Sequence, residues 1–200
     1  MIVSWSRLVS GNWRDPLVAR DVLIGLAGAA IVHALTGAGA FLAAHLSGIP
    51  PRVLTEWRPL LGGTHVITTV LNAAAWAVFM SLLFLFVLFT FRLLLRNEWA
   101  AILASALLLS AGVTLESGTP FALVPFLALN LLTFTVLSRV GLVATIAITF
   151  GLAMMEAFPL TIPLSGWTAG VGVIGILSLT ALAIACVRIA TGEHRRRRPA

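Results

Sequence analysis

Few side chains in this sequence could carry out chemistry. The chain of 200 residues contains 7 carboxylates, 4 histidines and a single cysteine, Cys186. All 13 basic residues are arginine, so no lysine is present for a P-loop, a kinase ATP site or a Schiff base. One cysteine excludes an intramolecular disulfide and a cysteine-rich metal site.

The motifs of intramembrane enzymes are also missing. A zinc protease needs HExxH, which places two imidazoles one helical turn apart, and the sequence contains no such run. An intramembrane aspartyl protease needs two aspartates within the membrane. Here both aspartates, Asp15 and Asp21, precede the first long apolar stretch. His33 has no GxSxG serine beside it. We therefore predict that the chain is not an enzyme and has no catalytic residue, cofactor or metal site.

Three polar residues, His33, Asn72 and Asn130, interrupt otherwise apolar stretches. A polar side chain within lipid needs a partner on another helix, so interhelical hydrogen bonding is the favoured role. Ligand binding is the alternative.

Two carboxylates, Glu116 and Glu156, are each followed within four residues by a proline. Both are expected to end a helix, where the helix dipole disfavours an anion. One hypothesis is that Arg52 or Arg58 folds over one of these carboxylates and caps the bundle. The alternative, which we favour, is that both are solvated loop acids.

The amino-acid composition indicates that these residues lie in a lipid bilayer rather than in water. The chain is 60% hydrophobic and 10% charged, whereas soluble domains carry about 25% charged residues. Its mean hydropathy is +1.05. The stretch from Val66 to Phe91 has no ionisable side chain, and as a helix it would reach roughly 39 Å, more than the ~30 Å core of a bilayer.

The pattern predicts an all-α polytopic membrane bundle of six transmembrane helices. A lead-in at 1–20, containing a short helix with interfacial tryptophans, precedes a membrane domain at 21–188 and a basic, disordered tail at 189–200. Small-residue pairs such as Gly25/Ala29 in the first span and Gly166/Gly170 in the last should permit close helix contact. The six predicted spans are Val22–Ala44, Val66–Phe91, Trp99–Leu115, Phe121–Leu137, Val140–Met155 and Gly166–Val187.

Arginines fix the predicted orientation. An even number of spans puts both termini on one side, and a cytoplasmic N-terminus leaves only Arg52 and Arg58 outside. The positive-inside rule favours that arrangement. With a net charge of +6, the expected partners are anionic lipid headgroups at the cytoplasmic face. Nucleic acid is not expected, since no aromatic residues are interleaved with the arginines of the tail.

Several segments resemble the C-terminal multi-pass membrane region of bacterial serine/threonine protein kinases. They are SGNWRDPLVARDVLIG, GIPPRVL with the following LLGG, LLLRNEWAAIL, and SRVGLVATIAITFGLAMMEAFPLTIPLSGWTAG. The sequence departs from that family in having no HRD, DFG, glycine-rich loop or lysine, so no kinase activity carries over to any residue here. The resemblance implies a fragment of a longer kinase or a free-standing copy of its membrane module, in a bacterial inner membrane.

These observations lead to one expected function and two alternatives. The expected function is a non-catalytic membrane module that anchors or regulates a signalling kinase, with outer loops able to receive a signal. The main alternative is a small transporter or channel subunit with a polar path near His33, Asn130, Glu116 and Glu156. A third is an assembly factor acting through the small-residue faces of the first and sixth spans. Besides lipid, the partners considered are a kinase domain and a second copy of the chain in a homo-oligomer.

Overall fold

The computed structural model describes residues 3–47, 58–117, 123–158 and 169–196. The regular secondary structure of these residues is entirely helical, with no strand among them. The predicted all-α class is therefore confirmed for the described part of the chain. The elements are α1 (Val3–Val9), α2 (Pro16–Ser47), the 3-10 turn η1 (Arg58–Leu61), α3 (Gly63–Leu95), α4 (Glu98–Ser117), α5 (Leu123–Arg139), α6 (Leu142–Ala157) and α7 (Ala169–Arg196).

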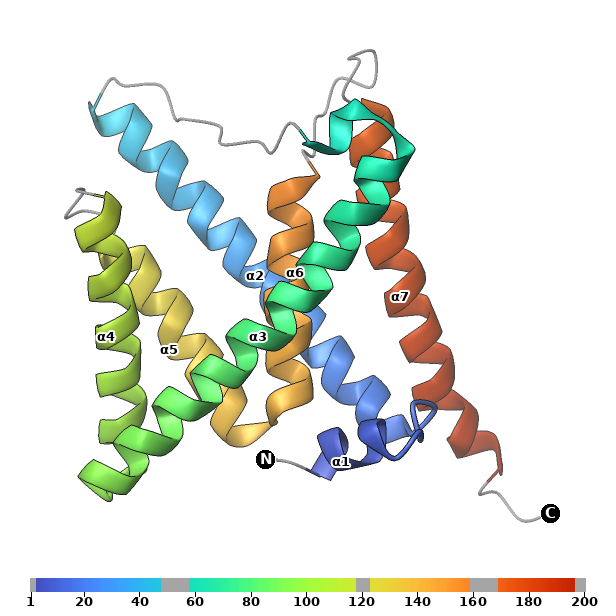
Figure 1. Cartoon of the computed structure of the whole chain (residues 1–200), viewed down its shortest axis with the longest axis horizontal. Coiled ribbons are helices and arrows are strands. Elements are labelled where there is room, and N and C mark those ends of the chain that lie inside the picture. The colour runs from blue at the N-terminus through green and yellow to red at the C-terminus, as the bar shows by residue number, and fades with distance from the viewer. Residues whose placement is uncertain (1–2, 48–57, 118–122, 159–168, 197–200) are drawn as a thin grey trace.

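The long helices alternate in direction between two ends of the bundle (Figure 1). α2 leads away from α1, α3 returns, and α4 to α7 continue the alternation, so that α1 and the last turn of α7 lie at the same end (Figure 1). We call this the α1 end. It also carries Arg92 and Arg96 at the end of α3 and Arg139 at the end of α5.

α6 lies at the centre of the bundle and packs against α2 and α3. Glycine makes the contact with α2 possible: a Cβ at Gly25 would lie 2.4 Å from the carbonyl oxygen of Ala144 and 2.5 Å from the Cβ of Ala147. On the other side of the contact, a Cβ at Gly151 would lie 2.7 Å from the Cβ of Ala29. The close approach predicted for the Gly25/Ala29 face is confirmed, and it is what brings the two backbones together.

A second apolar core joins α3, α4 and α5. Phe134 and Leu137 of α5 are fully buried there, against Leu88 of α3 and Ala101 and Ile102 of α4. The Phe134 ring lies 5.6 Å from that of Phe84, centroid to centroid. Interhelical packing of this density is the main source of cohesion for helices that lie in lipid.

Two helices extend beyond the predicted spans. α2 begins at Pro16 rather than after residue 20, because proline is well tolerated in the first turn, where its missing N–H has no partner to lose. α7 continues to Arg196, so the disorder predicted for the tail is wrong over residues 189–196. Of the predicted Gly166/Gly170 pair, Gly166 lies outside the described residues, and a Cβ at Gly170 would meet no described atom within 4 Å. Gly175 makes the close approach instead, with a Cβ position 2.5 Å from that of Phe158.

Among the described residues, three helices are long and apolar enough to cross a membrane: α2 over Pro16–Gly39, α3 over Gly63–Leu95 and α7 over Gly172–Thr191. α4, α5 and α6 are apolar but shorter by the same measure. Their lengths match the predicted third, fourth and fifth spans closely, so helices exist at all six predicted places. Length and composition identify three of the six as candidate spans.

Candidate functional site

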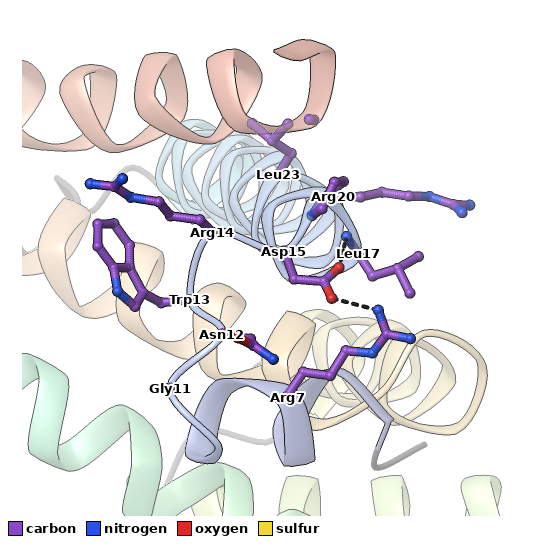
Figure 2. A pocket seen from close by; sticks show the side chains of 11 residues that line it. Arg7, Gly11, Asn12, Trp13, Arg14, Asp15, Leu17, Arg20 and Leu23 are labelled. Atoms are coloured by element: carbon purple, nitrogen blue, oxygen red, sulfur yellow. Dashed lines mark hydrogen bonds and ion pairs between the residues drawn. The ribbon is translucent and has the colours of Figure 1, made fainter. Parts of the chain in front are cut away.

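A pocket with a cavity volume of about 990 Å³ opens at the α1 end, beneath the turn that joins α1 to α2. We call it the basic pocket, because Arg7, Arg14 and Arg20 line it together with a single carboxylate, Asp15. Leu17 and Leu23 of α2 and Ala190 of α7 supply apolar wall. Figure 2 shows these side chains arranged around the first turns of α2.

The turn between α1 and α2 creates the pocket. Gly11 has a φ of +86°, a left-handed conformation that glycine adopts without strain. The N–H of Asn12 then donates to the carbonyl oxygen of Arg7 at 2.9 Å, which closes the turn. As a result, the end of α1 faces the start of α2.

Asp15 holds the turn together from its centre. Its Oδ1 accepts a hydrogen bond from the N–H of Leu17 at 2.8 Å, which caps α2. Its Oδ2 pairs with the Arg7 guanidinium at 2.5 Å (Figure 2). The Leu17 N–H and then Arg7 hold the pKa of Asp15 below its usual value, although partial desolvation opposes them.

Arg14 and Arg20 have a different environment from Arg7. Arg14 stacks over the ring of Trp13, 4.5 Å from its centroid, and Arg20 extends away on the other side of α2 (Figure 2). Within the described part of the chain, neither forms an ion pair with a carboxylate. The pocket therefore has two arginines that form no ion pair with a described carboxylate.

Replacing Asp15 with alanine is expected to reduce the free energy of unfolding by about 1 kcal/mol at neutral pH, since a helix cap and an exposed ion pair are lost. Because the folded-state pKa of Asp15 lies below its usual 3.8, the stabilisation is complete above that pH and disappears as the pH falls through the folded-state pKa. Unfolding in detergent at several pH values measures the difference. If the difference in unfolding free energy between the wild type and Asp15→Ala increased as the pH was lowered, this account would be contradicted.

A second pocket, of about 620 Å³, lies between α3 and α6 toward the other end of the bundle. Asn72 and His65 of α3 line it together with Glu156 of α6, and Trp76 and Phe79 supply an aromatic wall. We call it the α3–α6 pocket. It brings together two of the predicted site residues, Asn72 and Glu156, that are far apart in the sequence.

Asn130 has the interhelical partner that the sequence predicts. Its Nδ2 donates to Oγ of Ser110 on α4 at 3.0 Å, and Ser110 in turn donates to the carbonyl oxygen of Ala106 at 2.7 Å. Both side chains are buried. Asn130 of α5 and Ser110 of α4 thus pair with one another inside the bundle.

Ser105, one and a half turns before Ser110 on α4, provides a contrast. Its Oγ is buried and makes no hydrogen bond with the described residues. Ser105→Ala is expected to raise the unfolding free energy by up to about 1 kcal/mol, because an unsatisfied hydroxyl is removed. Ser110→Ala is expected to lower it by about 1 kcal/mol, because Asn130 loses its partner. The two variants are compared by thermal unfolding in detergent. If the unfolding free energy changed in the same direction in both variants, the assignment of a bonded Ser110 and an unbonded Ser105 would be refuted.

The remaining predicted site residues are not gathered with these. His33 is half-buried on α2, and Glu116 lies in the last turn of α4. Arg58 begins η1. Arg52 lies outside the described residues, as do the side chains of Arg58 and Glu116, so the capping of a carboxylate by either arginine stays a prediction.

The basic pocket is the feature that sequence reasoning missed. From its arginines the sequence predicts only a cytoplasmic location and an attraction to anionic lipid headgroups, although glycine at position 11 and an aspartate directly before Pro16 indicate a tight turn that caps a helix. The described residues contain no group of three or more histidine, cysteine, aspartate or glutamate side chains that could hold a metal ion.

Comparisons with protein-family models, with curated proteins and with solved structures found no match to this chain. The resemblance to the membrane region of bacterial kinases therefore depends only on the sequence segments quoted above.

Proposed function

We propose that this chain is a non-catalytic integral membrane module of a bacterial inner membrane, which crosses the bilayer six times and anchors or regulates a signalling kinase on the cytoplasmic side. The observation that carries the membrane part is the outward display of large apolar side chains along α3 and α7. On α3, Phe86 is 67% exposed and Leu94 is 74% exposed, and on α7 Leu177 is 61% exposed and Ile184 is 50% exposed. Soluble monomers rarely expose apolar surface on this scale.

Six crossings are favoured by the alternating path of the helices. Because α4, α5 and α6 run between the same two ends as α2, α3 and α7 (Figure 1), a layer of lipid around the long helices would contain the short ones as well. α6 is short for a span, with 16 residues, but most of one side of it is buried against α2 and α3. A helix that contacts protein more than lipid has less need to match the bilayer thickness.

Arginine placement supports a cytoplasmic α1 end. The described arginines lie at that end, apart from Arg58 in η1. Arg92 and Arg139 follow the C-terminal ends of helices, where the helix dipole favours a cation. With a cytoplasmic α1 end, both α1 and the end of α7 would lie on the side of the membrane where a cytosolic kinase domain is found.

Tight packing of the interior favours an anchor over a transporter. The α2–α6 contact is closed by glycine against alanine, and Asn130 is satisfied by Ser110 rather than directed into a path. The α3–α6 pocket is the observation that favours transport as the second candidate, since Glu156, Asn72 and His65 meet there. For that candidate, Glu156→Gln should abolish substrate flux in proteoliposomes without changing the amount of inserted protein.

The kinase association is tested in the native bacterium with an antibody against the end of α7. We expect the antibody to detect either a polypeptide longer than 21.2 kDa, or a chain of this size that co-purifies in mild detergent with serine/threonine phosphotransfer activity. A chain of this size without phosphotransfer activity, even after cross-linking in intact membranes, would contradict the kinase association. Recovery of the chain in the soluble fraction would contradict the membrane module itself.

A further inference from the structure

The basic pocket has both a cationic surface and an apolar surface, and a ligand with a charged part and an apolar part would contact both. Arg14, just before α2, and Arg20, in its second turn, form no ion pair in the described part of the chain, and Leu17 and Leu23 of the first turns of α2 provide an apolar wall. Arg7 is already paired with Asp15. The ligand that fits is an anion with an apolar extension.

The position of the pocket in the fold indicates where the anion would come from. It lies at the α1 end, where α2 enters its apolar stretch and where Ala190 brings α7 alongside. Trp13 is 57% exposed at the rim, and tryptophan is enriched at the headgroup level of membranes. A ligand in this pocket would have its charged group at the depth of the phosphates and its apolar part directed toward the hydrocarbon core.

We propose that the basic pocket binds the headgroup phosphate of an anionic phospholipid, with Arg14 donating to the phosphate oxygens, Arg20 adding positive charge on the other side of α2, and Leu17, Leu23 and Ala190 contacting the start of an acyl chain. This inference rests on the proposed membrane function and adds a defined lipid site to it. Guanidinium groups suit this role because they donate several N–H groups in a plane to phosphate oxygens.

Free phosphate shares the anionic chemistry but not the apolar contacts. A site for inorganic phosphate would be expected to surround the anion with converging donors, whereas here the Arg14 and Arg20 side chains extend to different sides of α2 (Figure 2). Rim cations with an apolar wall suit a headgroup that approaches along the bilayer surface. The lipid source is therefore the one we favour.

The test uses the full chain purified in detergent and measures retained lipid by native mass spectrometry. The probes are dioleoyl-phosphatidylglycerol, dioleoyl-phosphatidylcholine with the same acyl chains, and inorganic phosphate as a competitor. The pocket variant is Arg14→Gln with Arg20→Gln. The control variant, Arg96→Gln with Arg188→Gln, removes the same charge from the same end of the molecule but outside the pocket.

We expect the wild-type chain to retain one phosphatidylglycerol in preference to phosphatidylcholine, and excess inorganic phosphate to displace it only weakly. A loss of roughly fivefold in affinity for each arginine follows from attraction to an anionic surface alone. Direct donation to the phosphate should make the loss in the pocket variant at least about tenfold greater than that in the control variant. If the double variant fails to fold, Arg14→Gln and Arg20→Gln are compared singly with Arg96→Gln.

Four results would overturn the proposal or the function on which it rests, and they are distinguishable. Equal losses in the pocket and control variants would reduce the lipid preference to diffuse surface charge. Full displacement by inorganic phosphate would make this an anion site without a lipid. Failure of the wild-type chain to insert into membranes would overturn the proposed function, whereas normal insertion with unchanged lipid binding in the pocket variant would overturn the pocket alone.

Discussion

Replacing Gly25 with alanine is expected to lower the free energy of unfolding by about 2–3 kcal/mol, the upper part of the range for overpacking a closed interface. The added Cβ would lie 2.4 Å from a backbone oxygen of α6, and a backbone atom cannot move aside as a flexible side chain does. α2 and α6 would have to separate. Because α6 also packs on α3, the separation would loosen the centre of the bundle.

Gly37 on the same helix is the matched control. A Cβ at Gly37 would meet nothing within 4 Å, so Gly37→Ala is expected to be neutral or to stabilise the chain by up to about 1 kcal/mol through helix propensity. Both variants are measured by thermal or SDS-induced unfolding in detergent micelles. Equal effects at the two positions would show that α2 does not contact α6 as described.

Replacing Phe134 with alanine is the second change with a large expected effect. The ring is fully buried among α3, α4 and α5, and removing it leaves a cavity. In a soluble core this change costs about 3–5 kcal/mol. Between helices in lipid the transfer from water contributes less, and the lost packing contacts remain, so we expect about 2–3 kcal/mol.

Phe86 on α3 is the control for Phe134 and also tests the environment of the bundle. It is 67% exposed, and a phenylalanine that faces lipid loses little packing when it is truncated. Phe86→Ala should therefore change the unfolding free energy by less than about 0.5 kcal/mol in a bilayer mimetic. A loss at Phe86 comparable to that at Phe134 would mean that this face of α3 is covered by protein.

The sequence was sufficient to predict the helices but not how they pair. Long apolar stretches with arginines at their ends predict helices and their ends well, because the apolar run and the charge both reflect position relative to lipid. The small-residue face at Gly25/Ala29 was predictable for the same reason, as an interhelical contact surface. Nothing in the sequence indicated that this face meets α6 rather than a sequential neighbour, because neighbouring apolar helices offer similar surfaces to one another.

The candidate sites show where single-sequence reasoning fails. Asn130 was predicted to need a partner, but Ser110 could not be identified, since any hydroxyl on an adjacent helix would have served. The approach of Asn72 to Glu156 depends on the crossing of α3 over α6. The basic pocket depends on a single left-handed glycine, Gly11, that folds α1 back toward the start of α2.

The most direct test of the central claim is the sidedness of single cysteines in a Cys186→Ala background. The labelled positions at the α1 end are Asn12, Asn97 and Thr191, and those at the other end are Gly62 and Ser117. With a membrane-impermeant thiol reagent applied to sealed cells, six crossings predict labelling at Gly62 and Ser117 and protection of the other three until the membrane is opened. Labelling of Thr191 in sealed cells together with protection of Asn12, as three crossings would give, would contradict the account.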